Sequence, residues 1–214
     1  MGFFSIAIEL TGRPCLVVGG GKVGERKVLN LLEAGARITL VSPDATHVLA
    51  DLALTRQLVW LRREYQSGDI AGMTLVFAVT ADAGLNAQVA SDCRQAGIWV
   101  NVADAPGNCT FMVPSVVRRG DLQIAISTAG KSPALARQLR QKLEAEIGPE
   151  YGPWLDFLGE LRPFLKKAWP HDQKRREEVL RQLAGDEILF RLVARGKEEL
   201  AKERVKQCLS LPSV

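Results

Sequence analysis

The sequence predicts an α/β protein with an N-terminal Rossmann-type parallel sheet, followed by a small α+β segment and an all-helical C-terminal region. From Cys15 to about Val102, short β-rich runs alternate with helical patterns, as in βαβ units. A glycine-rich stretch, residues 19–24, joins the first β-rich run to the first helical pattern. From Trp154 onward, apolar residues recur only at helical spacing.

Length and composition agree with this organisation. The chain has 214 residues, of which 47% are hydrophobic, enough for one α/β core and a smaller appendage. We expect three parts, with boundaries at residues 1–110, 111–149 and 150–214. The formal charge of +4 is compatible with an anionic ligand and does not indicate a nucleic-acid partner.

The sequence gives no sign of a membrane segment or of a metal site. No uninterrupted apolar stretch approaches the roughly 18 residues of a membrane span, and the N-terminus lacks a basic leader. The four cysteines have no C-x-x-C spacing, and His47 and His171 are the only histidines, so we expect free thiols and no bound metal. We therefore expect a cytoplasmic protein with no membrane partner.

Five apolar runs predict the strands of the parallel sheet: 15–18, 37–41, 58–61, 73–79 and 98–102. The run at 73–79 is almost wholly apolar, which is typical of a central strand covered on both faces. Helices are predicted at 23–34 and 83–96. Each stops at a glycine, Gly35 or Gly97, the residue that most readily follows a helix.

The pattern changes after Pro106. Residues 111–117 and 122–127 predict either a hairpin or two extended segments outside the parallel sheet. Ser132 and Pro133 supply an N-cap and a first-turn proline for a helix over 134–147. The tail then carries leucines at helical spacing, at positions 155, 158, 161 and 165.

Gly19, Gly21 and Gly24 form a G-x-G-x-x-G motif directly after an apolar strand and at the start of a helix. The first glycine permits a tight turn, the second lets the backbone approach a pyrophosphate, and the third allows the helix to pack closely on the strand. The helix N-terminus receives the negative charge. We therefore expect a dinucleotide site, with a plain glycine turn or another nucleotide as the alternative.

The end of the second predicted strand bears on the choice of cofactor. NAD-binding proteins often place an acid about 20 residues past the glycines to bond the ribose. Asp44 lies two positions beyond that site, so it fits either a ribose ligand or a residue that starts a turn or caps a helix. No arginine occupies the strand end, which favours NAD. The candidate cofactor-binding residues are Gly19, Gly21, Lys22, Val23, Gly24, Pro43, Asp44 and Thr80.

A second informative stretch is Asn101-Val102-Ala103-Asp104-Ala105-Pro106, at the carboxyl end of a predicted parallel strand. Ligands of open α/β sheets bind at this edge. By spacing alone, Asp104 before Ala-Pro fits a loop-forming aspartate better than a catalytic one. Its location keeps it as a candidate.

Several motifs together resemble the precorrin-2 dehydrogenase family, which includes the N-terminal module of bacterial siroheme synthase. The resemblance runs from about Ile6 to Leu143, and from Tyr151 the tail is similar only in position and character. The motifs are Val18 to Lys27, Leu32-Glu33-Ala34-Gly35-Ala36, Asn101 to Pro106, Phe111-Met112-Val113-Pro114-Ser115 and Ser132-Pro133-Ala134-Leu135-Ala136-Arg137.

The resemblance implies NAD-dependent oxidation of precorrin-2 to sirohydrochlorin in siroheme biosynthesis. It also implies a homodimer in which residues 111–149 exchange between subunits, and it leaves open whether ferrous iron is inserted as well. The family's key aspartate falls on Asp104, which we take as the catalytic candidate. The candidate substrate-binding residues are Asn101, Ser127, Thr128, Lys131, Ser132 and Arg137. Siroheme synthase has a serine pair where this chain has Ser127-Thr128.

The residue chemistry fits this implication. Oxidation of a tetrapyrrole removes a hydride, which NAD accepts, and a proton, which a carboxylate such as Asp104 can take. The substrate's carboxylates favour nearby cations such as Lys131 and Arg137, although each is also compatible with a solvated surface charge. The alternative hypothesis is a non-catalytic NAD-sensing module with a helical dimerisation tail.

Overall fold

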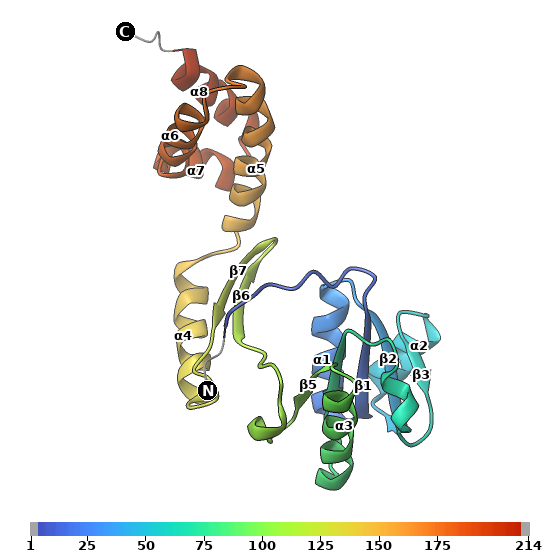
Figure 1. Ribbon diagram of the computed structural model, residues 1–214. Coiled ribbons are helices and arrows are strands. Elements are labelled where there is room, and N and C mark those ends of the chain that lie inside the picture. The colour runs from blue at the N-terminus through green and yellow to red at the C-terminus, as the bar shows by residue number, and fades with distance from the viewer. Residues whose placement is uncertain (1–3, 211–214) are drawn as a thin grey trace. The chain divides into compact units, whose positions relative to one another are not determined.

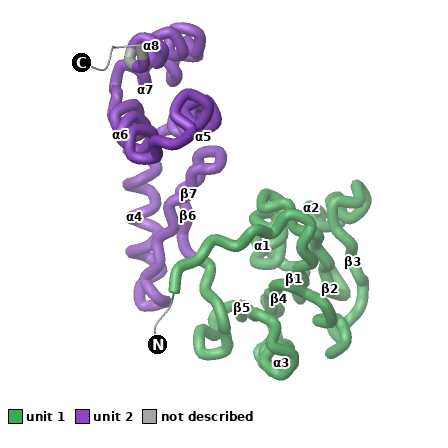
Figure 2. Tube along the Cα trace, turned by 45° about the horizontal axis from the view of Figure 1, so that its top comes forward, with its two compact units in different colours: residues 1–113 green, residues 114–214 purple. Residues whose placement is uncertain are grey.

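The computed structural model describes residues 4–210, and the chain divides into two compact units with the boundary between Val113 and Pro114 (Figure 2). The first unit has the expected α/β class. Its elements are β1 (Pro14–Gly20), α1 (Lys22–Glu33), β2 (Arg37–Ala45), α2 (His47–Leu54), β3 (Val59–Leu61), the 3-10 turn η1 (Ser67–Ile70), β4 (Leu75–Ala78), α3 (Ala83–Gln95), β5 (Trp99–Val102) and the 3-10 turn η2 (Pro106–Asn108).

The five strands form one parallel sheet in the order β3-β2-β1-β4-β5 (Figure 1). Val28 of α1 and Leu49 of α2 pack against one face of this sheet, and Val89 of α3 and Ile70 of η1 pack against the other. The strand order reverses between β1 and β4. In a doubly wound sheet this reversal opens a crevice at the carboxyl ends of the strands.

The predicted helix ends are confirmed. Gly35 has φ +72°, and the amide of Ala36 donates to the carbonyl of Leu31 at 3.0 Å, which closes the end of α1. Gly97 has φ +68° after α3. One helix was missed: α2 follows β2 directly and is capped by Thr46, whose hydroxyl accepts from the amide of Leu49.

The strand β2 is longer than predicted and carries an irregularity. Val18 pairs with Val41 and Gly20 pairs with Ala45, so β2 advances four residues where β1 advances two. The extra residues bulge out of the register. The sequence predicted that Pro43 and Asp44, both cofactor candidates, follow the strand. In the structure they lie in this bulge.

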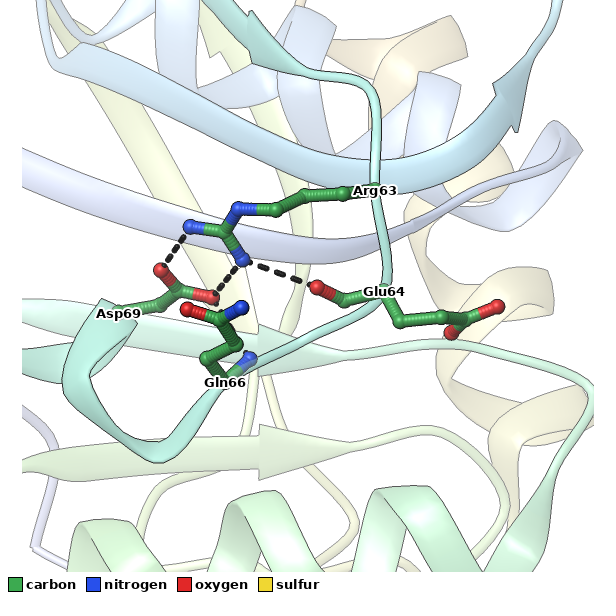
Figure 3. A network of polar contacts seen from close by, with 4 residues as sticks. All are labelled: Arg63, Glu64, Gln66 and Asp69. Carbon is green, nitrogen blue, oxygen red and sulfur yellow. Dashed lines mark hydrogen bonds and ion pairs between the residues drawn. The ribbon is translucent and has the colours of Figure 1, made fainter.

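An ion pair holds the turn that leads from β3 to β4 (Figure 3). The Arg63 guanidinium binds both carboxylate oxygens of Asp69, at 2.5 and 2.8 Å, and also donates to the Glu64 carbonyl. The backbone amide of Gln66 donates to the same carboxylate at 2.9 Å. Chiefly because of the Arg63 bond, the pKa of Asp69 lies below its ordinary value near 3.8.

In the second unit, β6 and β7 form the hairpin that was one of the two expected alternatives. The strands pair antiparallel around Gly120, whose φ of +58° suits a two-residue turn. The hairpin begins at Ser115, later than the predicted Phe111. Arg119 joins it to the end of α4 by donating to the carbonyls of Ile147 and Glu144. The elements are β6 (Ser115–Arg119), β7 (Leu122–Ile126), α4 (Pro133–Glu146), α5 (Tyr151–Ala168), α6 (Gln173–Ala184), α7 (Glu187–Ala194) and α8 (Glu198–Ser210).

The predicted helical tail is confirmed: residues 151–210 form four helices with a core of their own. Trp154 and Phe157 of α5 pack with Leu189 of α7 and Val205 of α8. Within residues 4–210, no helix is long and apolar enough to cross a membrane. The separation of residues 111–149 from 150–214 as two domains stays a prediction.

We predict that Asp69→Asn lowers the free energy of unfolding at pH 7 by about 1 kcal/mol, since it removes the charge from a bidentate pair. A lowered folded-state pKa stabilises the fold above the unfolded pKa, and this contribution is lost as the pH falls. The difference in free energy of unfolding between wild type and Asp69→Asn should therefore be largest above about pH 5. It should vanish below the lowered pKa of Asp69.

Urea unfolding at several pH values measures this difference. The matched control is Asp44→Asn, because Asp44 lies 3.8 Å from Arg62 with its side chain 94% exposed. That substitution should leave stability unchanged at both ends of the pH range. If Asp69→Asn lowered the free energy of unfolding by the same amount at all pH values, the assigned role of the ion pair would be contradicted.

Candidate functional site

The candidate residues of the first unit gather at the carboxyl edge of the sheet. β1, β4 and β5 are neighbours in the sheet and run in the same direction, so their carboxyl ends lie along one edge. The glycine motif begins in the last two residues of β1 and continues into α1, Thr80 follows β4, and Asp104 follows β5. Asn101 lies within β5 and pairs with Phe77 of β4. The fold thus brings together the predicted phosphate loop and the predicted catalytic residue.

Gly19 and Gly24 are required by close packing. A Cβ on Gly24 would lie 2.1 Å from the carbonyl oxygen of Gly19, so only glycine lets α1 approach the end of β1 this closely. Gly19 itself has φ +114°, and a Cβ there would meet the backbone of Val79 at 2.8 Å. These constraints match the roles predicted for the first and third glycines of the motif.

The two middle glycines, Gly20 and Gly21, differ in the space around them. A Cβ on Gly20 would lie 2.2 Å from the carbonyl oxygen of Asp44, and the Gly20 amide donates to the Ser42 hydroxyl at 3.0 Å. This role of Gly20 was not predicted from the sequence. A Cβ on Gly21 would have no neighbour within 4 Å. Gly21 therefore borders open space, as expected of a backbone position that a ligand approaches.

The N-terminus of α1 suits a diphosphate. Gly21 is its N-cap and supplies no side chain, so no side-chain cap covers the first-turn amides of Lys22, Val23 and Gly24. Free amides and the helix dipole together bind anions. Val23 stays 39% exposed beside them. The Lys22 ammonium lies 3.2 Å from Glu25, whose pKa is lowered first by the Thr46 hydroxyl and then by Lys22.

At the end where the sequence predicts the ribose, Asp44 does not cap α2, since Thr46 has that role. The Asp44 carboxylate is exposed and lies 3.8 Å from the guanidinium of Arg62, which also donates to the Pro43 carbonyl at 3.2 Å. Arg62 follows β3 and was not predicted, because the residues at the end of β2 give no sign of it. The structure therefore places a carboxylate and a guanidinium together beside the bulge of β2.

Thr80, just after β4, is held by a buried asparagine. The Thr80 amide and hydroxyl both donate to the side-chain oxygen of Asn86, at 3.1 and 2.9 Å, and the Asn86 side chain returns a bond to the Thr80 carbonyl. Asn86 is only 7% exposed. It was not predicted, although a lone asparagine on the buried face of an expected helix was a usable signal.

Asn101 and Asp104 have opposite surroundings. Asn101 is 8% exposed, and its amide nitrogen donates to the Phe111 carbonyl at 3.1 Å. Asp104 is exposed and has φ +55°, a left-handed conformation that aspartate adopts more readily than most residues. Such conformations are often found at functional sites. The loop interpretation of Asp104 is thus compatible with the catalytic one.

The remaining candidates lie in the second unit, in the turn before α4 and on α4 itself. The Ser132 hydroxyl accepts from the Leu135 amide at 3.2 Å, which confirms the predicted N-cap. The Thr128 hydroxyl accepts from the Ser132 amide, and the Ser127 hydroxyl accepts from the Ala129 amide. Lys131 closes the turn by donating its amide to the Thr128 carbonyl. Arg137 is exposed on α4.

Two family models match the chain. One, described as putative NAD(P)-binding, covers residues 6–115, and the other, described as sirohaem biosynthesis protein central, covers residues 119–146. These ranges coincide with the Rossmann unit and with the segment of the hairpin and α4. The family resemblance seen in the sequence is confirmed.

The chain is also similar to siroheme synthases along nearly its whole length. It is 39% identical over 208 residues to that of Methylobacillus flagellatus, and 40% identical over 203 residues to siroheme synthase 1 of Aeromonas salmonicida. The alignments cover 96% and 95% of this chain. They cover 44% and 43% of those relatives, so the chain spans less than half of their length.

Among solved structures, SirC, a precorrin-2 dehydrogenase, matches with a TM-score of 0.75 and 25% identity. The match covers 96% of this chain and 100% of that one. It includes the helical tail, for which the sequence had shown similarity only in character. Since the first family model covers just over half of the 214 residues, this chain belongs to the putative NAD(P)-binding family, and the central segment of the sirohaem biosynthesis proteins follows directly.

Proposed function

We propose that this chain oxidises precorrin-2 to sirohydrochlorin with NAD, as a step of siroheme biosynthesis. The observation that carries the proposal is the position of Asp104, two residues beyond β5 at the same sheet edge as the glycine loop. The likeness to siroheme synthases and to a precorrin-2 dehydrogenase over nearly the whole chain supports the substrate.

The first unit fits the cofactor. The open space at Gly21 and the uncapped N-terminus of α1 suit the pyrophosphate, and Asp44 and Arg62 suit the ribose end. Lys22, Val23 and Thr80 border the same edge. When bound, NAD supplies the hydride acceptor for the oxidation.

In this proposal Asp104 is the base that takes a proton from the substrate. Its carboxylate is exposed at the end of β5 and accepts no hydrogen bond from residues 4–210, so its oxygens are available to a substrate. The left-handed backbone of Asp104 turns the chain away from the strand immediately after Val102. A carboxylate held on this short turn can take the proton that leaves the ring as the hydride departs.

In this proposal the loop before α4 binds the carboxylates of the substrate. Ser127, Thr128, Lys131 and Ser132 gather at one helix N-terminus, with Arg137 one turn further along α4. In the homodimer implied by the family resemblance, this segment is exchanged between subunits. Leu135 and Leu139, one turn apart on α4 and 46% and 39% exposed, support a role of this helix in association.

The proposed activity is tested by incubating the chain with precorrin-2 and NAD without oxygen. The absorption spectrum of sirohydrochlorin should grow in step with that of NADH. A parallel sample with ferrous iron shows whether the spectrum proceeds to siroheme, which decides the second activity. Tight NAD binding without either spectral change would favour a non-catalytic NAD-sensing module.

The glycine loop gives a sharper test of the cofactor site. Gly21→Ala should unfold like wild type, because its Cβ enters open space, yet it should weaken NAD binding about tenfold or more by blocking the backbone's approach to the phosphates. Calorimetric titration with NAD measures the affinity. Gly68→Ala, also in open space but in η1, is the control and should bind NAD normally. Unchanged affinity in Gly21→Ala would place the pyrophosphate elsewhere.

Asp104→Asn should reduce turnover by about 100-fold or more and leave NAD affinity intact, since it removes the base and not the loop. Asparagine accepts the left-handed backbone, so the fold is kept. Asp82→Asn is the matched control, because Asp82 caps α3 and asparagine caps equally well. Steady-state rates of NADH formation give the comparison. Full activity in Asp104→Asn would remove this residue from the mechanism.

A further inference from the structure

One charged side chain at the site has no assigned role. Lys27 lies on the side of α1 that faces the sheet, and its ammonium lies 5.2 Å from the ring centre of Phe77 in β4. The Phe77 ring in turn meets Phe111 edge to face, with centres 5.5 Å apart. Phe77 is only 4% exposed. The half-buried cation thus lies against one of two packed aromatic rings.

Lys27 lacks an anionic partner. Within residues 4–210 its ammonium forms neither an ion pair nor a hydrogen bond, and it lies over the ring of Phe77. Burial lowers the pKa of Lys27, and the nearby Arg26 lowers it further, while Cys109 acts in the opposite sense. A half-buried cation without a counter-ion is costly for the fold, which points to a partner outside the chain.

The ammonium is nevertheless within reach of a ligand. No fully buried side-chain nitrogen or oxygen in the described chain lacks a hydrogen-bond partner, so the unbonded Lys27 nitrogen must keep contact with solvent. Side chains on a helix lean toward its N-terminus. Lys27 follows Lys22 by five residues, or roughly 7.5 Å of helix, and its stem leans back toward the ligand edge.

The position of Lys27 relative to the strands indicates which ligand it meets. Phe77 pairs with Asn101 in β5, and in parallel strands paired residues point to the same face. The Lys27 ammonium therefore lies on the β4–β5 side of the glycine loop, the side that carries Asn101 and leads to Asp104. Asp44 and Arg62, the proposed ribose contacts, lie on the β2–β3 side.

We propose that Lys27 binds a carboxylate of the tetrapyrrole substrate and so positions the ring next to Asp104. This inference rests on the proposed function. The carboxylate would pair with the ammonium while the edge of the macrocycle lies against apolar surface beside Phe111. The diphosphate of NAD already has partners in the amides at the start of α1, which belong to residues three to five positions before Lys27.

The test compares Lys27→Met with Arg26→Met. Both remove one cation from neighbouring positions of α1, but Arg26 is exposed and has no proposed role. Sirohydrochlorin, the reaction product, and NAD are titrated separately, so that ligand binding is measured without turnover. Lys27→Met should weaken sirohydrochlorin binding by about 10- to 100-fold and leave NAD affinity within about twofold. Arg26→Met should change neither.

Kinetics and a rescue variant separate binding from folding. Lys27→Met should raise KM for precorrin-2 with little change in kcat, and Lys27→Arg should recover most of the affinity because it keeps the charge. The role assigned to Lys27 would be overturned if Lys27→Met bound sirohydrochlorin normally or lost affinity for NAD alone. It would also be overturned if the wild-type protein failed to bind sirohydrochlorin. Wild type that binds sirohydrochlorin with the expected Lys27 dependence but oxidises nothing would overturn the proposed activity alone.

Discussion

The close approach of α1 to the end of β1 is the constraint on which the site depends. Gly24 lies so near the Gly19 carbonyl that a methyl group there would sit at 2.1 Å. This contact fixes where the helix begins, and therefore where its free amides point. It also sets the depth at which Lys27 crosses Phe77, because both lysine and amides belong to one rigid helix. A small change in the helix position would move the phosphate site and the cation together.

The strand order then divides the edge of the sheet into two chemically distinct halves. β2 and β3 bring Asp44 and Arg62, both exposed, to the half where a ribose is expected. β4 and β5 bring Thr80, Asn101 and Asp104 to the other half. The buried Asn86 and Asn101 each spend their amide nitrogen on a backbone carbonyl, so they hold the loops in place. Asp104, the proposed base, is exposed instead.

The sequence was a good guide wherever a residue's role follows from local backbone geometry. Gly35, Gly97 and Ser132 end or begin helices as predicted, because each depends only on its own conformation or on an amide three residues away. The sheet was predictable from its apolar runs. Residues whose role comes from another strand were missed: Gly20 is constrained by Asp44, and Arg62 reaches Pro43 across the sheet edge. The short helix α2 lacked a strong apolar period and was not foreseen.

Lys27 shows why spacing alone cannot reveal such groups. In the sequence it is one of three neighbouring charged residues, with Glu25 and Arg26, and nothing distinguishes it from them. In the fold, Glu25 pairs with Lys22, Arg26 faces solvent, and only Lys27 turns toward the sheet. A methionine would fill that place with no uncompensated charge. The presence of an ammonium against the ring of Phe77, at the edge where an anionic substrate is expected, is better explained by binding than by packing.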